Sequence, residues 1–227
     1  MITSKDLVSA LADRLYQWSE QVRHVFRRTS PEHYSRGELA PVVLLPGVYE
    51  TWQFLRPVGN RLNALGHPIH IIAELGYNRK TVTASAALAQ RYLDDLNLTG
   101  VILVAHSKGG LIGKHMMVTD DLTDRVAQLI AVNTPFGGST LARYALGATM
   151  RSFSPADETL TSLGANLTAN RRITSIYSRL DPLIPAGSEL AGATNVELSI
   201  VGHFRPLASR QLFATIEHAL HTSQGRE

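Results

Sequence analysis

Six short apolar segments recur along the chain from residue 42 onward, and longer amphipathic stretches separate them. Runs of apolar, β-branched residues between turn signals are typical of strands that are buried on both faces of a parallel sheet. Apolar residues at steps of three and four, as in the intervening stretches, are typical of helices that pack one face on a core. The pattern predicts strands at residues 42–45, 69–73, 101–104, 126–132, 173–178 and 196–201.

Strands that alternate with helices predict an α/β fold, with a mostly parallel six-stranded sheet, right-handed crossovers and helices on both faces. Ligands of such sheets bind beyond the carboxyl ends of the strands. We find neither an internal repeat nor a second domain, and we therefore expect residues 1–227 to form a single domain. Helices are predicted at residues 54–65, 81–96, 111–117 and 207–221.

Two segments do not fit this alternation. Residues 1–30 are predicted to form an N-terminal amphipathic helix, whose apolar side chains, from Leu7 to Val25, fall on one face. We expect this face to pack on the domain, and contact with a membrane surface or a second copy is the less favoured alternative. Residues 138–170 are predicted to form a small cap of short helices over the carboxyl edge of the sheet. Glycine and proline interrupt this cap, which suits the walls of a groove better than a moving lid.

Composition excludes several kinds of chemistry. The chain has no cysteine, so it holds no disulfide, thiol nucleophile or thiolate metal site. We find no metal-ligand spacing, no glycine-rich dinucleotide fingerprint and no basic patch with interleaved aromatic residues, and we expect no metal, cofactor or nucleic acid. The net charge is only +3. The N-terminal residues lack the apolar core of a signal peptide, which predicts a cytoplasmic protein; the oligomeric state is left open.

The strand at residues 101–104 leads directly into Ala105-His106-Ser107-Lys108-Gly109, and a helical pattern follows. A serine on a sharp turn between a strand and a helix is typical of a nucleophile elbow. The small residues Ala105 and Gly109 let the helix fold back over the strand. The backbone N–H of Lys108 then lies at a helix N-terminus, where unpaired N–H groups favour an anion. A small-x-Ser-x-Gly string is common by chance, and its place between strand and helix is what makes Ser107 a candidate nucleophile.

Two further polar residues are predicted to lie at the same edge of the sheet. Asp181 and His203 come shortly after the last two predicted strands. His203 could take the proton of Ser107, and Asp181 could fix the imidazole tautomer and stabilise its cation. Three other acids compete with Asp181 for this role, but none of them directly follows a predicted strand: Asp157, Glu158 and Glu189. We interpret His106, which adjoins the serine, as a packing residue.

Together these motifs resemble the α/β-hydrolases of the lipase/esterase type, over about residues 41 to 221. The resemblance implies a compact member with six strands and a Ser-Asp-His triad. It also implies that the second oxyanion amide, beside that of Lys108, is on Val48. Two positions depart from the usual pattern, since Ala105 replaces the first glycine of the elbow and Pro46 replaces a histidine. The matching segments are Leu45-Pro46-Gly47, Ala105-His106-Ser107-Lys108-Gly109-Gly110, Asn133-Thr134-Pro135-Phe136-Gly137-Gly138, Asp181 and Gly202-His203.

The expected activity is that of a serine hydrolase that cleaves carboxylic esters, of small molecules or lipids, through an acyl-enzyme. A thioesterase or an acyltransferase with the same triad is the close alternative. A ligand-binding module with a hydrolase fold is the alternative from another class. Apolar side chains near the expected site would contact an acyl chain, although each could equally belong to the core: Tyr49, Trp52, Phe136, Leu183 and Phe204.

Overall fold

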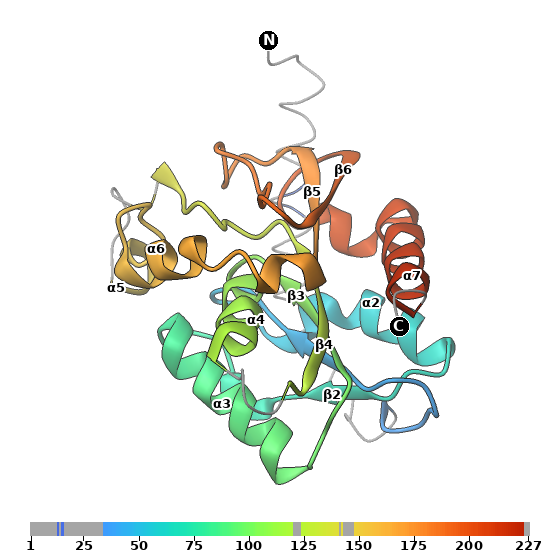
Figure 1. Ribbon diagram of the computed structural model, residues 1–227. Coiled ribbons are helices and arrows are strands. Elements are labelled where there is room, and N and C mark those ends of the chain that lie inside the picture. Colours follow the sequence, from blue (N-terminus) through green and yellow to red (C-terminus); the bar gives the residue numbers. More distant parts are fainter. Residues whose placement is uncertain are drawn as a thin grey trace.

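The computed structural model describes Asp13, Leu15 and residues 34–119, 124–140, 142 and 148–224 of the 227-residue chain. Its strands form one six-stranded parallel sheet in the order β2-β1-β3-β4-β5-β6 (Figure 1). This confirms the predicted fold class. The strands are β1 (Val42–Leu45), β2 (Ile69–Ile71), β3 (Val101–His106), β4 (Val126–Val132), β5 (Ile173–Leu180) and β6 (Thr194–Val201).

Helices cover both faces of the sheet (Figure 1). One face carries α3 (Val82–Asp95) and α4 (Lys108–Thr119), and the other carries α2 (Arg56–Ala64) and α7 (Arg210–Gln224). The chain runs from β1 to β2 and then returns past β1 to β3. This reversal makes the carboxyl ends of β1 and β3 the switch point of the sheet, which is where ligands bind in open α/β sheets.

The core consists of two clusters, one on each face of the sheet. Along β1, Val43 and Leu45 belong to the cluster under α3 and α4, whereas Val42 and Leu44 belong to the cluster under α2 and α7. All four side chains are at most 1% exposed. Successive residues of a strand point to opposite faces, so a strand that is covered on both sides has to be apolar at every position.

The observed boundaries differ from the predicted ones where tertiary contacts override the local pattern. Strand β2 ends at Ile71, and the 3-10 helix η3 (Ala73–Leu75) follows. The predicted helix at 54–65 is divided into η2 (Trp52–Leu55) and α2, because Pro57 suits only the first turn of a helix. Strand β6 begins at Thr194 because its polar first residues pair with β5, although as an edge strand it stays half exposed.

The described part of the cap contains α5 (Ala148–Arg151), α6 (Glu158–Ala165) and the 3-10 helix η5 (Ala169–Arg172). Residues 141 and 143–147 of the predicted cap lie outside the described residues. Asp157 begins α6 by accepting hydrogen bonds from the backbone N–H groups of Thr159 and Leu160.

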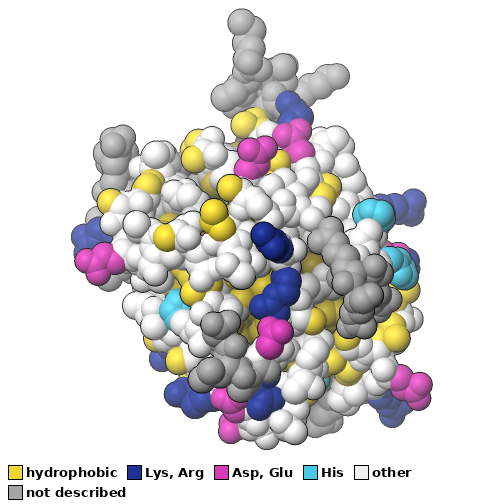
Figure 2. All heavy atoms as spheres, in the orientation of Figure 1, with side chains coloured by type: hydrophobic (Ala, Val, Ile, Leu, Met, Phe, Trp, Pro, Cys, Tyr) yellow, Lys and Arg dark blue, Asp and Glu magenta, His cyan; other side chains and the backbone are white. Residues whose placement is uncertain are grey.

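Over the face shown in Figure 2, most basic side chains have acidic neighbours. None of the helices in the described part of the chain has the length and apolarity that a bilayer-spanning segment needs.

The predicted N-terminal helix lies outside the described residues, apart from two helical positions. Asp13 is buried, with 3% of its surface exposed, whereas Leu15 is 61% exposed. The predicted apolar face included Leu15 and not Asp13. At these two positions the burial is therefore the reverse of the prediction, because Asp13 has hydrogen-bond partners on a distant loop.

Candidate active site

Ser107 lies on a sharp turn between β3 and α4, with a φ of 51°. This left-handed conformation is uncommon for a residue other than glycine. The helix after the turn passes very close to its neighbours: a Cβ on Gly109 would lie 2.0 Å from the carbonyl oxygen of Leu45, and a Cβ on Gly110 would lie 2.0 Å from Thr134 Oγ1. Both glycines are therefore required by the close approach of α4, and the turn has the geometry of a nucleophile elbow.

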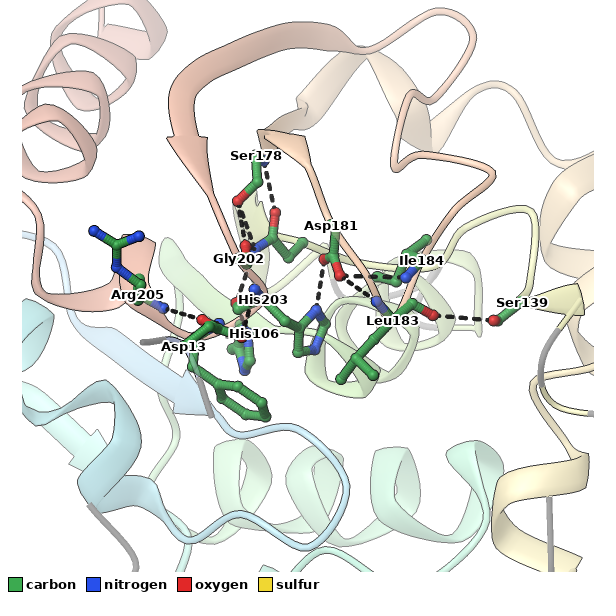
Figure 3. Close-up of polar contacts among 12 residues, drawn as sticks. Asp13, His106, Ser139, Ser178, Asp181, Leu183, Ile184, Gly202, His203 and Arg205 are labelled. Carbon is green, nitrogen blue, oxygen red and sulfur yellow. Dashed lines mark hydrogen bonds and ion pairs between the residues drawn. The ribbon is translucent and has the colours of Figure 1, made fainter. Parts of the chain in front are cut away.

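Asp181 and His203, which follow β5 and β6, form a short hydrogen bond. The His203 Nδ1–H donates to Asp181 Oδ2 over 2.6 Å (Figure 3). The other carboxylate oxygen, Oδ1, accepts from the backbone N–H groups of Leu183 at 2.8 Å and Ile184 at 3.2 Å. Burial alone would raise the pKa of Asp181, but His203 and the two N–H groups hold it below its usual value. Asp181 is thus an anion that fixes the tautomer of His203 with Nε2 free of a proton.

Ser107 and His203 line the same cavity, which has a volume of about 380 Å³. In the part of the chain that the structure describes, neither Ser107 Oγ nor His203 Nε2 makes a hydrogen bond, and catalytic pairs without substrate are often loose in this way. Most of the remaining lining is apolar and comes from the turn after β1, the cap and the loops after β4, β5 and β6: Val48, Tyr49, Pro135, Ala142, Met150, Phe153, Leu183, Ile184 and Phe204.

Two backbone N–H groups beside Ser107 are available to bind an anion. Among the described residues, neither the N–H of Val48 nor that of Lys108 donates to a protein acceptor. Lys108 begins α4, where the helix dipole favours negative charge. The turn that carries Val48 is closed by a hydrogen bond of 2.9 Å from the Gly47 N–H to Glu50 Oε2.

His106 does more than the predicted packing. Its Nδ1 lies 2.8 Å from Glu50 Oε1, and its Nε2–H donates to the His203 carbonyl over 3.0 Å. Burial opposes a charge here, but Glu50 and the carbonyl raise the pKa of His106 above its usual value. A proton on each ring nitrogen would let His106 donate to both partners. It connects the turn after β1 to the loop of His203.

This buried pair predicts a pH-dependent stability. The folded pKa of His106 lies above that of the unfolded chain, so its contribution is fully present below about pH 6.5 and is lost as the pH rises through the folded pKa. Glu50→Gln should remove this dependence and lower the free energy of unfolding by about 3–5 kcal/mol at low pH. Urea unfolding between pH 5 and 9 measures both effects, with the exposed His218→Asn as control. Glu50→Gln protein that keeps the wild-type pH slope would refute the assignment.

The Lys108 side chain is buried behind the elbow. Its ammonium donates to the backbone carbonyls of Asn78, over 2.8 Å, and Lys80, and to Asn78 Oδ1 over 3.1 Å. Asn78 Nδ2 in turn donates to the Pro46 carbonyl over 2.7 Å. Burial lowers the pKa of Lys108 to about 8. The side chain therefore holds the loop after η3 against the turn after β1.

Lys108→Met should retain most of the wild-type activity per folded molecule, because the ammonium is engaged with loop carbonyls and only the backbone N–H adjoins Ser107. The same change should lower the free energy of unfolding, by about 1–3 kcal/mol for each buried carbonyl left without a donor. Steady-state rates and urea unfolding separate the two effects, with the exposed Lys80→Met as the matched control. A folded Lys108→Met protein as inactive as Ser107→Ala would show that the ammonium itself takes part.

The predicted acyl-contact residues divide into two groups. Tyr49, Leu183 and Phe204 line the cavity. Trp52 and Phe136 do not: Trp52 makes an edge-to-face contact of 5.8 Å with Tyr34, and Phe136 is buried in the core under α3 and α4. Met150 and Phe153, which lie within the predicted cap at residues 138–170, complete the wall. Nothing in their local pattern distinguishes a wall residue from a core residue.

Two of the three competing acids are engaged elsewhere. Asp157 caps α6, and Glu189 accepts a hydrogen bond of 2.9 Å from the Tyr177 hydroxyl. Among the described residues, no group of three or more His, Asp or Glu side chains could hold a metal ion.

A larger cavity, of about 620 Å³, lies at the opposite edge of the sheet, near the amino ends of β3 to β6. Its lining includes Arg171 and Arg172, but Arg172 already donates to Asp124 over 2.5 Å and to the Val126 carbonyl over 2.6 Å. Parallel sheets bind ligands at the carboxyl edge. We therefore assign the candidate site to the smaller cavity, which is lined by Ser107, His203 and Val48.

Solved structures with the same architecture include esterases, lipases and a putative non-heme bromoperoxidase. A lipase from Bacillus licheniformis superposes with a TM-score of 0.61 at 14% identity, over 82% of this chain and 92% of that chain. A thermophilic esterase from Thermogutta terrifontis superposes with a TM-score of 0.57 at 16% identity, over 83% of this chain and 92% of that chain. A carboxylesterase structure from Nitrososphaera gargenis superposes with a TM-score of 0.60 at 14% identity, over 84% of this chain and 94% of that chain. No family model matches the chain, and no curated protein matches its sequence.

Proposed function

We propose that this chain, which has the α/β-hydrolase fold, is a serine hydrolase that cleaves carboxylic esters through an acyl-enzyme. The observation that carries the proposal is one cavity that contains Ser107, on its strained turn, and His203, held by Asp181. Fold likeness at low identity does not fix an activity, so the chemistry rests on these side chains.

In the proposed first step, Ser107 Oγ attacks the ester carbonyl carbon while its proton passes to His203 Nε2. Asp181 stabilises the imidazolium that forms. The carbonyl oxygen becomes an oxyanion, which the backbone N–H groups of Val48 and Lys108 would bind. When the tetrahedral intermediate collapses, the bond to the leaving alcohol breaks and His203 gives that alcohol the proton. A water molecule then attacks the acyl-serine by the same route, which releases the acid and restores Ser107.

The cavity favours short- to medium-chain acyl groups. Its volume of about 380 Å³ and its largely apolar wall suit a small hydrophobic acyl chain. The described cap helices are short, with four residues in α5 and eight in α6. A lid that opens at an oil–water interface needs a long amphipathic helix that can lie on lipid. We therefore infer that the enzyme obeys simple saturation kinetics with dissolved esters.

A fluorophosphonate probe tests the proposal, because it reacts only with an activated serine. Mass spectrometry should find the probe on Ser107, and p-nitrophenyl esters of increasing chain length should then show the highest rates with short to medium chains. Folded protein that takes up no probe and hydrolyses no ester would favour the binding-module alternative. Faster turnover of acyl thioesters, or transfer to added alcohols, would move the activity to a thioesterase or an acyltransferase. A sharp rise in rate at the micellar transition would contradict the inference that the cap forms the walls of a groove and does not act as a lid.

A further inference from the structure

Asp13 holds the backbone of the loop that carries His203, although 190 residues separate them in sequence. Its Oδ2 accepts from the His203 N–H over 3.0 Å, and its Oδ1 accepts from the N–H groups of Phe204 and Arg205, each over 2.8 Å. Asp13 is 3% exposed. In Figure 3 its carboxylate lies against this loop, on the side away from Asp181.

Three successive N–H groups at this loop need an acceptor. The 3-10 helix η6 (Arg205–Ala208) begins here, and the first N–H groups of a helix have no partner within it. A buried N–H without an acceptor costs about 1–3 kcal/mol, and bonds to a carboxylate are stronger than bonds to a neutral acceptor. The Asp13 carboxylate satisfies all three groups together, so the loop conformation depends on it.

The loop is shaped to admit this carboxylate. Gly202 has a φ of +126°, and a Cβ at this position would lie 2.5 Å from Asp13 Oδ1. A side chain on residue 202 would therefore both strain the backbone and displace Asp13. The turn before His203 and the position of Asp13 thus require each other.

The remaining polar groups of His203 are held from other sides. Its carbonyl accepts from His106 Nε2 over 3.0 Å and from Asn133 Nδ2 over 2.8 Å, and its ring Nδ1–H donates to Asp181. Its N–H is the group that Asp13 holds. Every polar group of His203 except Nε2 is therefore fixed by a buried partner, and Nε2 is the atom that would exchange protons with Ser107.

We propose that Asp13 is a positioning residue for the reaction. Its carboxylate holds the His203 loop in the geometry in which Nε2 can take the proton of Ser107. The inference rests on the proposed function, and Asp13 acts through the backbone of His203 without touching the substrate. Binding of the Asp13 carboxylate to the loop and activity are then coupled, because both depend on the same three hydrogen bonds.

Full-length Asp13→Ala and Asp13→Asn test the proposal. Asp13→Ala removes all three acceptors and should lower kcat about 10- to 100-fold while KM changes little, since a small displacement of a catalytic group costs rate rather than substrate binding. Asp13→Asn keeps one oxygen for two N–H groups and should give an intermediate kcat. Assays run well below the melting temperature of each variant keep all proteins folded. The matched control is Asp157→Ala, which removes another carboxylate that accepts two backbone N–H groups and should leave kcat unchanged.

Two readouts separate positioning from general stabilisation. The proton between His203 Nδ1 and Asp181 should give a far-downfield NMR signal, which should broaden or vanish in Asp13→Ala but persist in Asp157→Ala. Formate added to Asp13→Gly should restore part of the lost kcat by occupying the vacated N–H groups. Asp13→Ala with the wild-type kcat and an unchanged downfield signal would overturn the proposal, whatever its melting temperature.

The same experiment distinguishes failure of the proposed function from failure of this inference. Wild-type protein that turns over no ester would refute the hydrolase assignment. The downfield signal alone would then decide the role of Asp13. Loss of the signal in Asp13→Ala would support the proposal that Asp13 positions His203, and persistence of the signal would exclude that proposal. Active wild-type protein with equally active Asp13 variants would leave the hydrolase in place and remove Asp13 from its mechanism.

Discussion

Replacing Ser107 with alanine should reduce ester turnover by about 10⁴-fold or more, because the members of a triad act as a unit. The fold should persist, since only one hydroxyl is lost and Ser107 Oγ makes no hydrogen bond among the described residues. Initial rates with purified protein and a circular dichroism spectrum measure the two effects. Ser139→Ala is the matched control, because Ser139 lines the same cavity but donates to the Leu183 carbonyl over 3.1 Å. Near-normal turnover by Ser107→Ala would place the nucleophile elsewhere.

Asp181→Asn should lose about 10³- to 10⁴-fold in kcat. The two N–H groups of Leu183 and Ile184 require an oxygen at the Oδ1 position, so the amide nitrogen is directed to the Oδ2 position, opposite His203 Nδ1. An N–H donor there favours the tautomer that carries its proton on Nε2. That tautomer cannot accept the proton of Ser107.

Steady-state rates across the pH range test Asp181→Asn, with Glu189→Gln as the control for a rival carboxylate. Glu189 bonds to Tyr177, and its replacement should leave turnover close to that of the wild type. Loss of activity in Glu189→Gln with a normal Asp181→Asn would transfer the role of the acid to Glu189.

The fold could be predicted because the apolar pattern of each short segment indicates whether that segment forms a strand or a helix. A strand that is covered on both faces must be apolar throughout, so β1 and β4 were predicted with their observed boundaries. The meeting of Ser107 and His203 at one cavity follows from topology, since parallel strands bring their carboxyl ends to one edge. Strand β6 was predicted two residues too short because an edge strand is half exposed and carries polar residues.

The contacts between distant segments could not be predicted. Nothing in the sequence near Asp13 indicates that its carboxylate binds the backbone of His203, and the apolar periodicity predicted a buried helix face that excludes Asp13. The buried ammonium of Lys108 and the buried imidazole ring of His106 likewise depend on partners from other loops, Asn78 and Glu50. Apolar residues carry the least information, because a phenylalanine in a cavity wall, such as Phe204, and one in the core, such as Phe136, have the same local pattern.

The close approach of α4 to its neighbours determines where the specificity of this protein can be altered. Gly109 and Gly110 follow the candidate nucleophile Ser107 within three residues, yet any side chain on them would meet the Leu45 carbonyl or the Thr134 side chain at 2.0 Å. Variant libraries at these positions would consist largely of misfolded protein. Tyr49 and Met150 line the cavity that contains Ser107, and both are partly exposed to solvent, with 41% of the Tyr49 surface exposed. Selection for longer or bulkier acyl groups should therefore accumulate substitutions in the turn after β1 and in the cap, and leave the elbow unchanged.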